Sequence, residues 1–224
     1  MSTKKAVLSV QEELRKELGG LKDRVEPPSG YMISTKAKTF TLPDGSANAG
    51  PLVCVVLDWV TANTYFEGIY NPKDVKPPVC WAIDNEPSKA KPSKHATKPQ
   101  GDLCKECKQN EWNSAPGDSK GKACKNTRRV LVVPANATEK TQPWVISVSP
   151  TGLKYFDKYV NSLADTGTHP IEVVTEISFE PSEAYPSLRF EVTEKHDNVE
   201  MMWALKNAGN EILFQEPKVE DKAA

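Results

Sequence analysis

Four of the five cysteines in this chain fall in one polar stretch and are spaced like metal ligands. They are Cys80, Cys104, Cys107 and Cys124, and 23, 2 and 16 residues separate successive members. A two-residue gap lets the thiolates of Cys104 and Cys107 reach one ion from a tight turn. Two further cysteines complete the closed four-sulfur set that is typical of structural zinc. The spacing therefore predicts a structural zinc site made by these four residues.

Other ligand sets stay open on the sequence alone. His95 lies between Cys80 and Cys104, so a site in which His95 replaces Cys80 is an alternative. Four cysteines also suit an iron–sulfur cluster, and a CxxC pair suits a dithiol or a disulfide, although no other feature of the sequence indicates redox work. Cys54 stands inside the apolar run LVCVVLD and is predicted to be a small buried hydrophobe.

No catalytic motif accompanies the cysteines, and we expect a protein that is not an enzyme. The zinc deaminase pattern needs a Glu two residues after its first ligand and a Pro before its CxxC pair. Here Cys80 is followed by WAID, and Leu103 precedes Cys104. A nucleophile motif and a glycine-rich phosphate loop are also absent. A metal-dependent nuclease would need carboxylates such as Asp58 and Glu67, but the sequence assigns these to no site.

Basic residues crowd around the last of the four cysteines, in the segment SKGKACKNTRR. A loop pinned by a metal holds such cations in fixed positions, which lowers the entropic cost of meeting a phosphate chain. Aromatic side chains beside a basic surface offer faces on which the bases of a single strand stack. The predicted nucleic-acid contacts are Lys120, Lys122, Lys125, Arg128 and Arg129 for phosphates, and Trp112, Tyr65 and Phe66 for bases.

Charge is unevenly distributed along a chain whose net charge is only −1. Residues 80–129 hold 11 Lys and Arg against 6 Asp and Glu, whereas residues 191–224 hold 4 against 8. A basic middle fits a polyanion-binding surface, and an acidic tail can compete for that surface or recruit a replication partner. There is no run of about 18 apolar residues and no apolar leader, so we expect a cytoplasmic protein with no membrane contact.

Hydrophobic patterning predicts the elements that must position these residues. Apolar and β-branched runs predict strands, and a helix with Ser149 as N-cap and Pro150 at its first position is expected to end at Gly167. A last helix over 198–214 is expected to break near Gly209. The expected strands are 31–42, 51–60, 128–134, 143–149, 171–179 and 186–192, with 63–70 as part of a hairpin.

The order of these elements predicts a mainly β, α+β chain built as an OB-like barrel, with one helix before its last two strands. The expected parts are an N-terminal amphipathic helix and linker in 1–30, an OB-like domain in 31–196, and a C-terminal helix with an acidic tail in 197–224. A long zinc-binding insertion occupies roughly residues 80–129 of that domain. Because this insertion has few aliphatic residues, zinc would supply its ordering energy.

The cysteine segment also resembles a known group of proteins. CKECKQNEWNSAPGDSKGKACKNTRRVLVVP carries the pattern C-x2-C…N-x-[WF]-x-S…GK-[GA]-C-K…R-R, and the downstream VISVSPTGLKYFDKYVNSLADTGTHPIEVVTEISF is similar as well. Both blocks resemble phage-encoded, zinc-containing single-stranded DNA-binding proteins of OB type. The resemblance implies a role in phage DNA replication or recombination in the host cytoplasm, with the metal cysteines and the basic run after Cys124 carried over.

The leading hypothesis is thus a single-stranded DNA-binding protein with a structural zinc ion. The alternative is a zinc-stabilised adaptor or inhibitor whose basic loop meets an acidic surface of a host protein. The sequence indicates neither the oligomeric state nor a preference between DNA and RNA.

Overall fold

The computed structural model describes residues 30–69, 73, 76–117 and 119–217. Except for Gly30, the segment expected to hold the N-terminal helix lies outside these residues. So do Tyr70, at the end of the expected hairpin, and residues 218–224 of the acidic tail.

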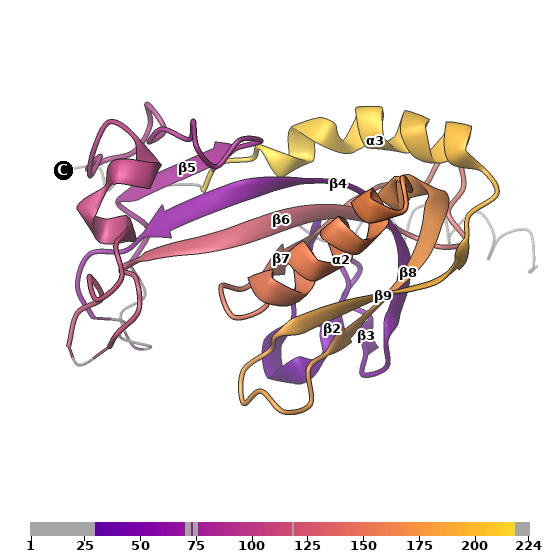
Figure 1. The fold of residues 1–224 in the computed structure, drawn as a ribbon, viewed down its shortest axis with the longest axis horizontal. Helices are drawn as coiled ribbons and strands as arrows, with labels where there is room; N and C mark the ends of the chain where they lie inside the picture. The colour runs from indigo at the N-terminus through magenta and orange to yellow at the C-terminus, as the bar shows by residue number, and fades with distance from the viewer. Residues whose placement is uncertain (1–29, 70–72, 74–75, 118, 218–224) are drawn as a thin grey trace, which may run out of the picture.

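One long strand, β4 (Leu52–Tyr65), organises the main sheet (Figure 1). The antiparallel strand β6 (Cys124–Pro134) pairs with it from Cys54 to Tyr65. On the other edge, β8 (Val173–Phe179) pairs with the start of β4, and β5 (Cys80–Asp84) pairs with its end. The seven-stranded sheet has the order β1-β7-β6-β4-β8-β9, with β5 beside β4. Its other strands are β1 (Met32–Ile33), β7 (Trp144–Val148) and β9 (Leu188–Lys195), and a second sheet joins β2 (Phe40–Thr41) to β3 (Ala47–Asn48).

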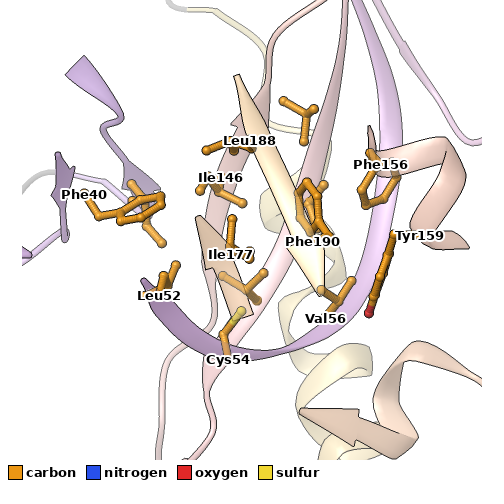
Figure 2. Packing of buried hydrophobic residues seen from close by; sticks show 14 of the residues in the cluster. Phe40, Leu52, Cys54, Val56, Ile146, Phe156, Tyr159, Ile177, Leu188 and Phe190 are labelled. Carbon is orange, nitrogen blue, oxygen red and sulfur yellow. The ribbon is translucent and has the colours of Figure 1, made fainter. Parts of the chain in front are cut away.

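A helix packs on each face of the apolar half of this sheet. Successive residues of β4 alternate between two cores, which is why its sequence is an almost continuous apolar run. Helix α2 (Leu153–Asp165) covers one face, where Phe156 packs edge-on against Phe190 of β9 with ring centroids 5.1 Å apart (Figure 2). Helix α3 (Val199–Leu213) covers the other face through Met202 and Leu205.

A bulge in β4 between Val56 and Asp58 changes which residues face each helix. Leu57 belongs to the α3-side core, and Asp58 also faces α3, because its Oδ2 lies 3.2 Å from Lys206 Nζ. The alternation is therefore reversed after the bulge, and Trp59 packs with the α2-side core. Beyond this point the odd-numbered residues of β4 lie on the α2 side of the sheet.

The expectation of a mainly β, α+β chain is confirmed, because the described residues form one large sheet and two α-helices. Helix α2 precedes the last two strands, as predicted. The OB-like barrel is not confirmed: β1 and β9 end the sheet on opposite sides, and no pairing among the described strands closes it. No helix in this part of the chain has the length and apolar character needed to cross a membrane.

Two strand predictions are wrong. Residues 63–65 do not begin a hairpin but continue β4, because its backbone stays paired with β6 through Tyr65. The segment 31–42 is not one strand, since Ala37 and Lys38 both have φ of 53° and divide it into β1, a 3-10 turn over Lys36–Lys38, and β2.

The helix boundaries also differ in part from expectation. Helix α2 begins at Leu153 with Gly152 as its N-cap, not Ser149, and ends before Gly167, whose φ of 66° stops the helix as predicted. Helix α3 runs through Gly209 without a break. A Cβ at Gly209 would lie 2.8 Å from Pro143 Cγ, so glycine here permits close packing of the helix on the loop before β7.

We predict that Gly209→Ala destabilises the protein, although alanine is the better helix former. Overpacking costs about 1–3 kcal/mol, which exceeds the gain of up to about 1 kcal/mol in helix propensity. The free energy of unfolding in urea, followed by circular dichroism, measures the balance. The exposed neighbour Asn210→Ala is the control and should leave stability unchanged or slightly raised. A stabilised Gly209→Ala protein would show that the helix has room to move away.

Candidate metal centre and basic groove

Two of the four clustered cysteines are placed by the end of β4. Its last residue, Tyr65, pairs with Cys80 of β5 on one side and with Cys124 of β6 on the other. Residues directly opposite each other on neighbouring strands direct their side chains to the same face of a sheet. Both thiols therefore lie on the face that α2 covers farther along the sheet.

The other two cysteines come from a tight turn above this face. The 3-10 turn η2 (Cys104–Glu106) contains Cys104, and the backbone N–H of Cys107 donates to the Cys104 carbonyl at 3.4 Å. The Cys104 N–H donates in turn to the Ala90 carbonyl at 2.9 Å, which ties the turn to the preceding loop. A turn of this kind presents both sulfurs in one direction, as the CxxC spacing predicts.

All four cysteines line one small cavity of about 10 Å³, a volume on the scale of a single water molecule or ion. Cys80, Cys104 and Cys124 are buried and Cys107 is half-buried. All five cysteines of the chain are free thiols. The fifth, Cys54, lies apart in the α2-side core as predicted, where burial raises the pKa of its thiol (Figure 2).

The cavity disfavours bare thiolates. Burial raises the pKa of Cys80 and Cys104, and it raises the pKa of Cys124 to about 12. Neighbouring cysteines also raise the pKa of each of these three thiols, because like charges gathered in a buried space repel. A divalent cation would offset this repulsion, since a coordinating thiol loses its proton to solvent and binds the metal as a thiolate.

Hydrogen-bond donors surround the sulfurs and favour their charged form. The backbone N–H of Gln100 lowers the pKa of Cys80 against the effect of burial, and the backbone N–H of Thr64 does the same for Cys124. The side-chain amide of Asn63 likewise lowers the pKa of Cys104 against the effect of burial. Donors of this kind are the usual outer partners of metal-bound ligands.

The four sulfurs that line this cavity fit a closed structural site for a thiophilic ion. As they stand, no three Cys, His, Asp or Glu side chains within the described residues form a group that could hold a metal ion. Binding would therefore require the cysteine side chains to turn farther into the cavity that they already share. His95 is exposed, does not line this cavity, and its N–H donates to Ser93 Oγ at 3.1 Å. The structure thus brings Cys80, and not His95, to the other three cysteines.

A hollow of about 460 Å³ opens next to the cysteine cavity on the same face of the sheet. Its lining includes Leu153, the first residue of α2. Figure 1 shows β4 and β6 extending past the start of this helix toward the cysteine segment. No carboxylate from the described residues lines it. We call it the basic groove; its charged lining is Lys105, Lys122 and Arg128, and its polar lining is Thr61, Asn63, Ser88, Asn110 and Asn126.

Strand register explains the floor of the basic groove. Thr61 of β4 lies opposite Arg128 of β6, and Asn63 lies opposite Asn126. Asn126 Nδ2 donates to Asn63 Oδ1 at 2.8 Å. The apolar face that α2 covers therefore continues as a polar and basic face where the helix no longer covers it.

Arg128 is a half-buried cation of the basic groove. Within the described residues no hydrogen bond or ion pair engages its guanidinium. Lys122 is better held, because its Nζ donates to Asn110 Oδ1 at 3.2 Å and lies 5.5 Å from the ring centre of Trp112. Trp112 itself is 72% exposed. A half-buried arginine in a groove whose described lining holds no carboxylate favours an anionic ligand.

The remaining predicted contacts are placed elsewhere. Arg129 faces the α3 side and donates to the carbonyls of Leu213, at 3.1 Å, and Gln215, so it caps the end of α3. Burial lowers the pKa of its guanidinium. Lys120, Lys125 and Phe66 are exposed but do not line the basic groove, and Tyr65 lines the cysteine cavity instead.

Sequence reasoning missed Lys105 and the asparagines of the groove. Lys105 lies between the two cysteines of the CxxC pair, and its position within the turn was the available signal. The sequence carries no signal for Asn63 and Asn126, because the contact between them depends on the register of β4 against β6. The sequence matches no protein-family model, and comparisons with curated proteins and with solved structures found no match.

We predict that the purified protein carries about one zinc ion per chain and that Cys104→Ser loses most of it, because one of four thiolates is removed. Metal content after unfolding measures this, with a colorimetric zinc indicator. Cys54→Ala and His95→Ala are matched controls that should retain the full amount. Full zinc in the Cys104→Ser protein would rule out the proposed site.

Proposed function

We propose that this protein binds single-stranded DNA through the basic groove and that a zinc ion held by Cys80, Cys104, Cys107 and Cys124 keeps the groove in shape. The observation that carries the proposal is a groove lined by Arg128, Lys105 and Lys122, in which the described residues supply neither a partner for Arg128 nor a carboxylate. Phosphates neutralise such cations and release counterions, which favours binding.

The surroundings of the groove favour a single strand. Exposed Trp112 is held next to Lys122 and offers a ring face for a base. Asparagine and hydroxyl side chains in the lining can bond the edges of bases, which a duplex keeps paired.

The acidic end of the chain comes close to the basic segment. Ser93 Oγ donates to Glu216 Oε1 at 2.6 Å, which holds the chain after α3 against the cysteine-bearing insertion. In this proposal the acidic tail competes with DNA for the basic surface or recruits a replication protein. An OB-like fold and a role in phage DNA replication or recombination in the host cytoplasm belong to the same proposal. They rest on element order and on the resemblance of the cysteine segment.

The second candidate is an adaptor or inhibitor that binds an acidic protein surface through the same groove. One observation favours it: among the residues that the structure describes, no aromatic side chain lines the groove, and Trp112 stands outside the lining. Capture of a host partner that survives nuclease treatment, together with no binding of oligonucleotides, would favour this function.

We predict that Arg128→Gln weakens binding to oligo(dT) about five- to tenfold at low salt, because one charge-assisted contact is lost. The slope of log affinity against log salt should fall by about 0.7, the contribution of one phosphate on a single strand. Fluorescence anisotropy titrations at several salt concentrations measure both effects. Lys140→Gln removes the same charge from the loop after the far end of β6 and should change little. Equal effects of the two substitutions would exclude the groove as the binding site.

We further predict that Trp112→Ala weakens oligo(dT) binding by about 1–3 kcal/mol through the loss of base stacking. Trp203→Ala is a matched control, because Trp203 on α3 is also exposed and also has a lysine, Lys206, over its ring at 5.1 Å. The measurement is the same anisotropy titration, supported by quenching of tryptophan fluorescence. An unchanged affinity of Trp112→Ala would show that this ring does not stack on DNA.

A further inference from the structure

Asn63 belongs to both candidate sites. Its side chain is buried, with 4% of its surface exposed, and it lines both the cysteine cavity and the basic groove. No other position on the floor of the groove reaches the cysteine cavity within the described residues, since Thr61, Asn126 and Arg128 line the groove alone.

The hydrogen bonds of Asn63 have a defined direction. Its Oδ1 accepts from Asn126 Nδ2 at 2.8 Å, so its NH2 group is the end left to donate into the cavity that Asn63 shares with Cys104. Two linked amides therefore run from the cysteine cavity to the floor of the groove.

A second link joins Cys104 to the wall of the groove. Asn110 Nδ2 donates to the Cys104 carbonyl at 2.8 Å, and Asn110 Oδ1 accepts from Lys122 Nζ at 3.2 Å. Lys105 follows Cys104 directly in the turn η2. Two of the three cations of the groove are thus positioned through the residue that also supplies a sulfur.

The segment that carries Lys105 and Lys122 has only a small apolar core of its own. Its apolar cluster consists of Ala82, Ala90 and Cys104. Such a cluster buries too little apolar surface to order a segment of this length. The position of Arg128 does not depend on this segment, because Arg128 lies on β6 in the main sheet.

We propose that Asn63 is a positioning residue that couples the two sites, so that the basic groove is complete only when Cys104 is bound to metal. This inference rests on the proposed function and adds its regulation by metal. A metal-bound sulfur is a strong hydrogen-bond acceptor and holds the Asn63 amide toward it, which holds Asn126 in turn. Without metal, Lys105 and Lys122 lose their fixed positions. Arg128 alone then remains in place to bind DNA, and binding is weaker than with all three cations.

The test compares Asn63→Leu with Thr61→Val. Both positions are buried, on the same strand and the same face, and both line the groove, but only Asn63 reaches the cysteine cavity. Competition with a chromophoric chelator should show roughly 10–100-fold weaker zinc binding by Asn63→Leu and no change for Thr61→Val. Equal zinc affinities for these two variants would overturn the role of Asn63.

The second measurement uses the wild-type protein with and without zinc. Removal of zinc should weaken oligo(dT) binding at least about tenfold, as expected for the loss of two phosphate contacts, and added zinc should restore it. Far-ultraviolet circular dichroism should show that the sheet is retained. Unchanged binding after zinc removal would overturn the coupling while leaving the groove as the DNA site. No binding by the zinc-loaded protein would overturn the proposed function and its regulation, and the chelator competition would still decide the role of Asn63 at Cys104.

Discussion

The pairing of β4 with β6 is the interaction on which the rest of the structure depends. Eleven registered residue pairs join the two strands from Cys54 to Tyr65, across one bulge. In the first half of this ladder the side chains are apolar and support a helix on each face. In the second half the same ladder carries Thr61, Asn63, Asn126 and Arg128 and ends at Cys124, so one continuous hydrogen-bonded frame positions both a core and a candidate site.

The second half of this frame is stable because the first half stabilises it. Polar strand ends bury little apolar surface and add little stability of their own. They are held by a sheet whose central strand is covered by α2 and α3, and the end of α3 is itself fixed to β6 by Arg129. Rigid placement of polar side chains by a distant core lowers the entropic cost of binding, which is the physical advantage of building a site on strands.

Much of the frame could be predicted from sequence, because continuous apolar runs and helical periodicity report local structure. The pairing of the strands could not be predicted in this way. No local pattern indicates that β5 pairs with β4, and element order alone suggested a closed barrel. The gathering of the four cysteines was foreseeable from their spacing, and Lys105 could have been found from its place within the CxxC pair, whereas Asn63 could not. The separation of Arg128 from Arg129 follows from a simple rule: adjacent strand residues face opposite sides, so only one of two neighbouring arginines can enter a groove.

The arrangement of charge around the cysteines has its own energetic logic. Four thiols that share a cavity resist ionisation, and three cations that share a groove resist one another. In the proposed function, each group is stabilised by a ligand of opposite charge: a metal cation for the sulfurs and an anionic chain for the cations. Asn110 and Lys105 are joined to Cys104, and Asn63 lines both sites, so ordering one group would lower the cost of ordering the other. Linkage then requires that the anion also favour metal binding, by the same factor by which metal favours the anion.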